Sequence, residues 1–125
     1  MSKPVFYHPR EYSRDEAKEI FASADTTSIT ELMIGLAYHD DDWPWVLDRC
    51  VELAASEHAQ LRYISALCIS HLARIHGEID LSLARPVLLR LEADPEQFVS
   101  VMAEDAIGDL QIFLDVDLRD GRMFN

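Results

Sequence analysis

The residues in this sequence that most readily do chemistry are its histidines, and their spacing argues against a metal site. There are five of them: His8, His39, His58, His71 and His76. His71 and His76 are five positions apart, which puts them about 140° from each other around a regular helix, so they cannot chelate one ion from it. We therefore expect no metal and no cofactor. We expect His71 to be a buried histidine satisfied by a neighbouring group.

Other catalytic signatures are absent from the sequence. It contains no GxSxG, HExxH, GxxxxGK[ST] or GxGxxG motif, and its four glycines are too scattered to form a phosphate-binding loop. Cys50 and Cys68 have no CxxC or His/Cys ligand spacing, and both fall on apolar faces of expected helices. We expect them to be reduced thiols in the core, with a disulfide or a reactive thiol as the alternatives. An enzyme is therefore not expected.

A pair of carboxylates, Asp105 and Asp109, lies one helical turn apart. Such pairs can bind metals or transfer protons. A di-iron bundle, however, requires Glu-x-x-His motifs that this chain lacks. Val101 and Ile112 flank the pair on the same face, where a solvated helix face would be polar. This mixture of acidic and aliphatic residues suits the docking of a basic partner; a solvated face or further helix packing are the alternatives.

The densest group of functional side chains is the segment HDDDWPW at residues 39–45. Its aspartates can simply turn the chain and cap a helix, with the tryptophans in the core. If one indole is exposed, carboxylates beside it form a good anchor for a partner's arginine or lysine. A weaker patch is the strip of Tyr63, Ser70 and Arg74, for which an ordinary polar edge is the alternative. The candidate partner-binding residues are Asp40, Asp41, Asp42, Trp43, Trp45, Tyr63, Arg74, Asp105 and Asp109.

The elements that position these residues are expected to be helices. Apolar residues recur with helical spacing nearly everywhere, and no segment alternates with period two. The spacing Ser13/Glu16, repeated at Ser28/Glu31, predicts two capping boxes that open helices. The expected helices are 13–23, 28–39, 43–55, 59–75, 83–93 (with Pro86 in its first turn) and 95–114, with an extended lead-in at 1–12 and a loose acidic tail at 115–125. The helix at 59–75 has apolar residues on two faces and should be central.

Two of these helix pairs can be superimposed at an offset of 38 residues, as Cys50 on Leu88 and Ile69 on Ile107 illustrate. A period near 40 with two antiparallel helices per unit is typical of a HEAT-like solenoid. We therefore expect one all-α domain over residues 1–125, with about six helices in a short HEAT-like stack. An irregular helical bundle is the alternative.

Composition and charge narrow the possible partners. The chain has 125 residues, 49% of them hydrophobic, and a net charge of −12. Residues 92–125 hold nine acids against two bases. Such a surface repels nucleic acid and anionic membranes and speeds encounter with a basic protein. Because the sequence shows neither a long uncharged stretch nor an apolar leader, we expect a cytoplasmic protein that does not enter a membrane.

Three stretches together carry a family resemblance: DWPWV at 42–46, HLARIHG at 71–77 and EDAIGDL at 104–110. The sequence resembles small bacterial HEAT-like proteins that look like immunity proteins of contact-dependent inhibition and other polymorphic toxin systems. The resemblance covers about residues 28–114. It implies a cytosolic inhibitor that binds one cognate toxin domain tightly, and many such toxins are nucleases with basic clefts. The alternative is a HEAT-like adaptor for an endogenous partner.

Overall fold

The computed structural model describes residues 9–120 and 122–123 and is all-α, as predicted. In this part of the chain six helices are followed by a two-stranded hairpin. They are α1 (Arg14–Ser23), α2 (Thr26–His39), α3 (Trp43–Leu53), α4 (Ala59–His76), α5 (Leu81–Glu92), α6 (Gln97–Leu114), β1 (Val116–Asp117) and β2 (Arg122–Met123). Residues 1–8 of the predicted lead-in, and residues 121, 124 and 125 of the predicted tail, lie outside the described residues.

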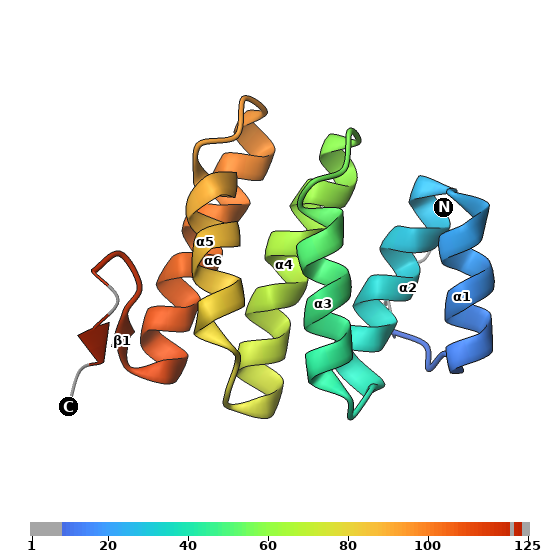
Figure 1. Ribbon diagram of the computed structural model, residues 1–125, viewed down its shortest axis with the longest axis horizontal. Coiled ribbons are helices and arrows are strands. Elements are labelled where there is room, and N and C mark those ends of the chain that lie inside the picture. The colour runs from blue at the N-terminus through green and yellow to red at the C-terminus, as the bar shows by residue number, and fades with distance from the viewer. Residues whose placement is uncertain (1–8, 121, 124–125) are drawn as a thin grey trace, which may run out of the picture.

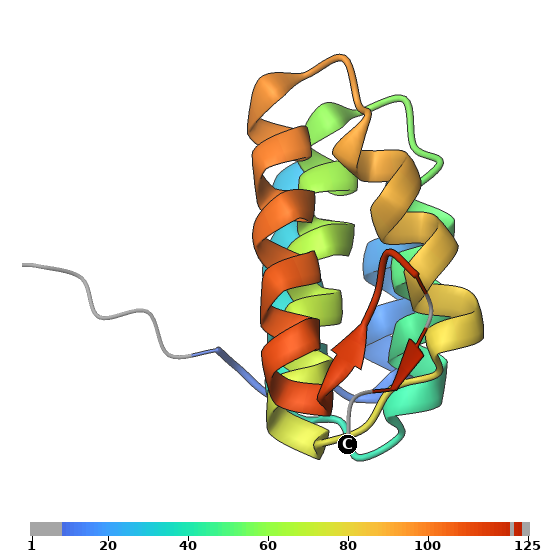
Figure 2. The ribbon, with the colours of Figure 1, turned by 90° about the vertical axis from the view of Figure 1, so that its left-hand side faces the viewer.

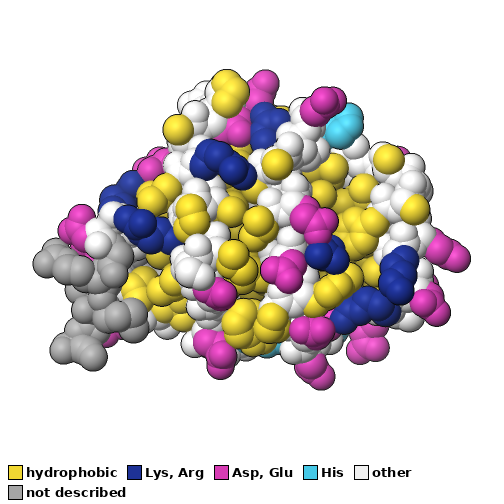
Figure 3. Space-filling view, in the orientation of Figure 1, with side chains coloured by type: hydrophobic (Ala, Val, Ile, Leu, Met, Phe, Trp, Pro, Cys, Tyr) yellow, Lys and Arg dark blue, Asp and Glu magenta, His cyan; other side chains and the backbone are white. Residues whose placement is uncertain are grey.

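The helices form two layers (Figures 1 and 2). Helices α1, α3 and α5 make one layer, and α2, α4 and α6 make the other. Helix α4 packs on both α2 and α6 within its own layer and on α3 across the layers, so it is the centre of the molecule, as its two apolar faces predicted. Figure 3 views the layer of α1, α3 and α5, where acidic and basic side chains are interspersed over apolar ones.

The helix ends follow from local sequence, with two corrections. Ser13 and Glu16 form the predicted capping box of α1, and Asp42 caps α3. The predicted second capping box at Ser28 is wrong. Asp25 caps α2 instead, because its carboxylate accepts the Ser28 backbone N–H at 3.1 Å and so starts the helix two residues before Ser28.

Helix α5 also begins earlier than predicted. Asp80 accepts the Ser82 N–H at 3.0 Å, so the helix starts at Leu81 rather than Leu83. Pro86 consequently lies inside α5 and not in its first turn. The helix that ends before Gly77 was predicted correctly: that glycine has φ of 71°, the left-handed conformation that terminates α4.

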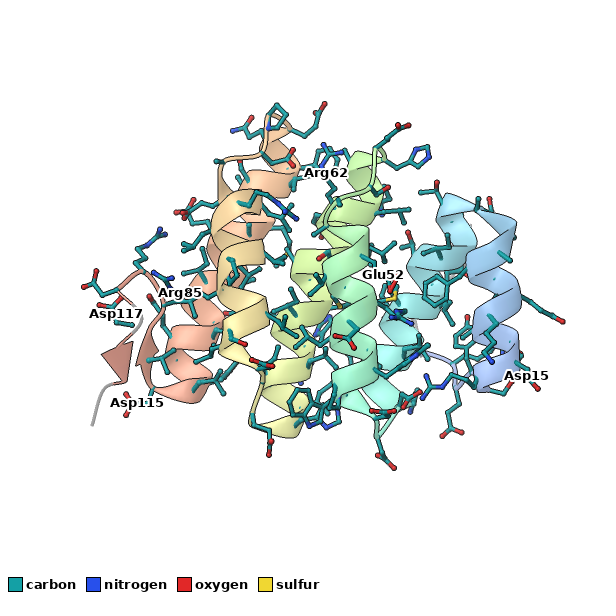
Figure 4. The ribbon with its side chains drawn as sticks, in the orientation of Figure 1. Asp15, Glu52, Arg62, Arg85, Asp115 and Asp117 are labelled. Atoms are coloured by element: carbon teal, nitrogen blue, oxygen red, sulfur yellow. The ribbon has the colours of Figure 1, made fainter. Side chains whose placement is uncertain are left out.

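The 38-residue offset is visible in the element bounds. Helix α5 begins 38 residues after α3, and α4 and α6 span ranges displaced by the same 38 residues. Equivalent core residues are buried in both units, for example Ile69 and Ile107. Arg62 at the start of α4 joins the two units, since its Nε and Nη2 donate to Asp94 at 2.7 and 3.1 Å (Figure 4). This guanidinium lowers the pKa of Asp94.

The cysteines are core thiols, as expected. Cys50 on α3 and Cys68 on α4 are both free and fully buried. The Cys68 thiol beside it, together with burial, raises the pKa of Cys50 well above its ordinary value. Burial leaves neither thiol accessible for chemistry.

The prediction of a loose tail after residue 114 is wrong for the described part of it. Val116 and Leu118 are 2% and 1% exposed, and β1 pairs antiparallel with β2. Arg85 on α5 points to this hairpin (Figure 4) and donates to the carbonyls of Leu118 and Arg119 at 2.6 and 2.7 Å. Two-residue strands are too short to produce a periodic pattern, which is why the sequence did not reveal them.

The described part of the lead-in, residues 9–12, contains no helix or strand and crosses α2 at Gly35. A Cβ at Gly35 would lie 2.3 Å from the Arg10 carbonyl oxygen and 2.6 Å from the Tyr12 ring. His39 Nε2 lies 2.6 Å from the Pro9 carbonyl oxygen. The absence of a side chain at Gly35 therefore lets the lead-in dock on α2.

Candidate protein-binding site

Three of the predicted binding residues form contacts with an arginine of this same chain. We call Arg14, Asp40, Asp42 and Trp45 the Arg14 clamp. Arg14 Nη1 lies 3.2 Å from Asp40 Oδ2, and its Nη2 lies 3.7 Å from Asp42 Oδ2. The guanidinium carbon stands 3.5 Å from the centroid of the Trp45 ring. The anchor that the sequence predicted for a partner's arginine is thus occupied by Arg14 from α1.

The clamp carboxylates also fix the turn between α2 and α3. Asp40 Oδ1 accepts the Asp42 N–H at 2.8 Å, and Asp42 Oδ1 accepts the Trp45 N–H at 3.3 Å. Trp45 packs edge-on against Phe21 of α1, with ring centroids 6.4 Å apart. These contacts give the clamp a structural role. Asp41 and Asp42 are both exposed, but only Asp42 of the two takes part in the clamp.

Both tryptophans are partly buried, which settles a point that the sequence left open. Trp43 and Trp45 each pack against the core, and neither is among the exposed large apolar residues of the described chain. The flat side of Trp45 is covered by Arg14, and Arg49 stands 5.0 Å from the same ring. Trp45 also lines a hollow of about 450 Å³ together with Phe21 and Leu53, so part of its ring remains accessible.

A second surface lies on the opposite layer, between α4 and α6. We call it the α4–α6 groove; it has a volume of about 420 Å³ and is lined by Tyr63, Gln97, Phe98, Val101, Met102 and Asp105. The rings of Tyr63 and Phe98 pack at 5.9 Å and form one wall. Phe98 and Val101, which line the groove from α6, are each 46% exposed.

The outward side of α6 continues this apolar character along the helix. Phe98, Val101, Asp105, Gly108 and Ile112 share one side at helical spacing, and Ile112 is 77% exposed. A Cβ added at Gly108 would meet no atom within 4 Å, so this side is open. The sequence of α6 contains three acids and no lysine or arginine.

The predicted carboxylate pair on α6 is split by the structure. Asp105 is exposed at the groove, whereas Asp109 is half-buried and accepts a 2.8 Å hydrogen bond from the Ser70 hydroxyl of α4. Residues four apart differ by about 40° around a helix. That difference turns Asp109 toward α4 and leaves Asp105 facing solvent.

Arg74 belongs to a small cluster at the end of α2 and α4. Its Nη2 donates to Tyr38 Oη at 3.4 Å and to His71 Nδ1 at 3.2 Å, and the Tyr38 and His71 rings pack at 5.1 Å. Burial and, secondarily, the Arg74 charge lower the pKa of His71. The expectation that a neighbour satisfies His71 is confirmed, although the residue is partly rather than fully buried.

The structure therefore separates the predicted residues into two groups. Tyr63, Arg74, Asp105 and Asp109 lie on the layer of α2, α4 and α6, and the others lie around the turn between α2 and α3. Sequence reasoning missed Phe98, Met102 and Tyr38. The signal for Phe98 was present in the sequence, since it continues the outward stripe of Val101, Asp105 and Ile112 one turn earlier.

Residues 9–120 and 122–123 show neither a group of metal ligands nor a helix suited to a membrane. In that part of the chain, no three His, Cys, Asp or Glu side chains are placed to hold one metal ion. Nor does any described helix combine the length and the hydropathy that crossing a membrane requires.

Comparison with known proteins places the chain in a family. No protein-family model matches it, and no curated protein sequence does. Among solved structures, the chain is similar to one in the crystal structure of a CDI complex from Cupriavidus taiwanensis LMG 19424, with 32% identity and a TM-score of 0.75. The match covers 89% of this chain and 98% of that one. The chain therefore belongs to the same family as that component of a CDI complex, a family of small helical proteins resembling the immunity proteins of contact-dependent inhibition.

Proposed function

We propose that this protein is an immunity protein that binds and neutralises a cognate toxin domain. The observation that carries the proposal is the match at 32% identity to nearly the whole of a chain from a CDI complex. Because the two chains share a fold and are nearly equal in length, this chain presents a similar helical scaffold for binding a toxin. We propose that it is a HEAT-like stack acting as an inhibitor, not an enzyme, in the cytoplasm.

The charge of the chain supports a basic toxin, such as a nuclease. Nuclease clefts are basic because they bind phosphates, and this chain has a net charge of −12. Opposite charges steer two proteins together and raise the association rate, whereas buried apolar contacts slow dissociation. The α4–α6 groove provides both an open carboxylate, Asp105, and exposed apolar side chains.

Among the residues predicted from sequence, we assign the partner contacts first to Tyr63 and Asp105, which line the α4–α6 groove. Asp109 is a secondary candidate, because it turns toward α4 and bonds Ser70. Arg74 lies on the layer of α2, α4 and α6 and Asp41 is exposed at the turn, so both are further candidates. Asp40, Asp42 and Trp45 are secondary candidates because Arg14 already occupies them. Trp43, which packs on the core, is secondary as well.

We expect a toxin domain to be encoded directly upstream of this gene, and the test is a binding and protection experiment with that domain. Calorimetry with a catalytically inactivated toxin domain is expected to give a 1:1 complex with nanomolar affinity. Co-expression with the active domain is expected to restore growth. The matched control is a toxin domain of the same fold from another system, which should neither bind nor be neutralised. Absence of binding to the upstream domain, or capture of an endogenous complex instead, would contradict the immunity proposal and favour an adaptor.

A further inference from the structure

We infer that the α4–α6 groove receives an apolar side chain of the toxin, next to a toxin arginine or lysine that pairs with Asp105. The inference rests on the proposed function and specifies its contact surface. It names Phe98, Val101 and Met102, together with Tyr63, as the apolar part of the site.

The first argument is the distribution of exposed apolar side chains. The described residues include six large apolar side chains that are exposed: Tyr38, Leu83, Phe98, Val101, Ile112 and Phe113. Four of these six belong to α6, and three of the four lie on its outward stripe. Scattered apolar residues on a surface are ordinary, but Phe98 and Val101 lie together in one groove, and exposed apolar side chains grouped in this way favour a protein-binding surface.

The second argument is the local charge. Helix α6 contains Glu104, Asp105 and Asp109 and no lysine or arginine. Asp109 is bonded to Ser70, and Glu104 lies close enough to Arg119 to interact with its charge. Asp105 is left exposed at the edge of the groove, and no basic group among the described residues is bonded to it. A basic side chain of a partner fits this position.

The same charges argue against a second copy of this chain as the occupant. Two α6 helices packed against each other would bring three acids onto three acids, and like charges that face each other at an interface disfavour association. A basic partner removes that repulsion. The occupant is therefore a different protein of opposite charge, as a nuclease toxin would be.

The position of Arg74 indicates where along α4 and α6 the basic residue of the toxin lies. Arg74 comes 11 residues after Tyr63 on α4, about 16 Å along the helix axis at 1.5 Å per residue. A second basic group of the partner is disfavoured near Arg74 and favoured near Asp105. We therefore place the toxin's basic residue in the groove beside Asp105, and not at the other end of α4, where Arg74 contacts Tyr38.

The experiment measures the affinity of the inactivated upstream toxin domain for four variants. Val101→Glu places a charge in the groove and is expected to weaken binding about 30-fold or more, as for a central apolar contact. Asp105→Lys is expected to weaken binding about 10-fold, mainly by slowing association, and to reduce its salt dependence. The matched controls are Leu83→Glu, an exposed apolar residue on α5, and Glu19→Lys, an exposed acid on α1. Both controls are expected to stay within about twofold of wild type.

The outcomes separate the inference from the function on which it rests. Wild-type binding with the expected loss in both groove variants, and melting temperatures unchanged, supports the inference. Wild-type binding with groove variants no weaker than their controls overturns the groove and leaves the immunity function standing. If the wild-type chain does not bind the upstream domain, the proposed function fails and the inference fails with it.

Discussion

The Arg14 clamp and the α4–α6 groove contain the same kinds of group, carboxylates beside aromatic rings, but only the clamp has a base of its own. In the clamp, Arg14 lies over Trp45 and pairs with Asp40 and Asp42. In the groove, Asp105 lies near Tyr63 and Phe98 with no arginine or lysine on α6. Residue types alone therefore do not mark a binding surface. The presence or absence of an intramolecular counter-charge distinguishes the two.

The largest expected difference is between two aromatic truncations. Trp45→Ala is expected to lower the free energy of unfolding by about 2–3 kcal/mol, because it removes a half-buried ring packed on Phe21 and Arg14. Phe98→Ala is expected to cost about 1 kcal/mol or less, since its ring is 46% exposed. Urea denaturation measures both values.

The order of the two variants is expected to reverse when toxin affinity is measured instead of stability. Phe98→Ala is expected to weaken binding strongly, and Trp45→Ala to leave the affinity of the folded protein close to wild type. A Trp45→Ala protein that stays fully stable but no longer binds would reverse the comparison and make the clamp the interface.

Alanine substitution is expected to change the stability in opposite directions at two glycines. Gly35→Ala is expected to destabilise the protein by about 1–2 kcal/mol, because its Cβ would meet the Arg10 carbonyl oxygen and displace the lead-in. Gly108→Ala is expected to stabilise it by about 0.5–1 kcal/mol, since alanine favours a helix and that side of α6 is open. Melting temperatures of the two variants test this, and a stabilising Gly35→Ala would show that the lead-in does not depend on close contact with α2.

Two arginines give a smaller contrast. Arg14→Ala is expected to lower the free energy of unfolding by about 1 kcal/mol, because it removes a cation–π contact and two charge pairs and leaves Asp40 and Asp42 to repel each other. Arg74→Ala, at an exposed position, is expected to cost about 0.5 kcal/mol or less. Equal losses in chemical denaturation would contradict the structural role of the clamp.

The smallest expected effect is a pH dependence of stability that arises from His71, in the cluster with Tyr38 and Arg74. Burial and Arg74 lower the pKa of His71, so the unfolded chain takes up this proton at a higher pH than the folded chain. The contribution to stability is complete above about pH 6.5, the ordinary histidine value, and is lost as the pH falls through the lower folded value. His71→Phe keeps a ring beside Tyr38 and should flatten the stability profile between pH 7.5 and 5.5.

The control for this measurement is His58→Gln, at the exposed residue that precedes α4. It should leave the slope of stability against pH between these values close to that of wild type. An unchanged slope in the His71→Phe protein would show that His71 does not contribute to the pH dependence.

The sequence predicted the elements well because their signals are local. Ser13, Asp42 and Gly77 each act within one helical turn, and each was placed correctly. The errors arose where two local signals competed or where the signal was distant. Asp25 outcompeted Ser28 as a cap, and the hairpin after α6 depends on Arg85, more than 30 residues earlier in the chain.

The candidate site was less predictable for the same reason. The pairing of Arg14 with Asp40 joins the start of α1 to the end of α2, and no periodic pattern reports such a contact. The exposure of Phe98 and Val101 depends on which side of α6 is left uncovered by α4, which only the assembled layers decide. Residue types could therefore indicate both surfaces as candidates, but they could not show which of the two is open to a partner.

The Arg14 clamp affects how readily this protein binds basic proteins other than its partner. An acidic protein with an open indole and adjacent carboxylates would attract any arginine-rich polypeptide in its surroundings, with little regard to its shape. By occupying that position itself, Arg14 makes every such competitor displace an intramolecular contact first. Selectivity among basic proteins then depends on the α4–α6 groove, where an apolar side chain of the partner must also fit. The occupied clamp and the open groove therefore both contribute to the discrimination between partners.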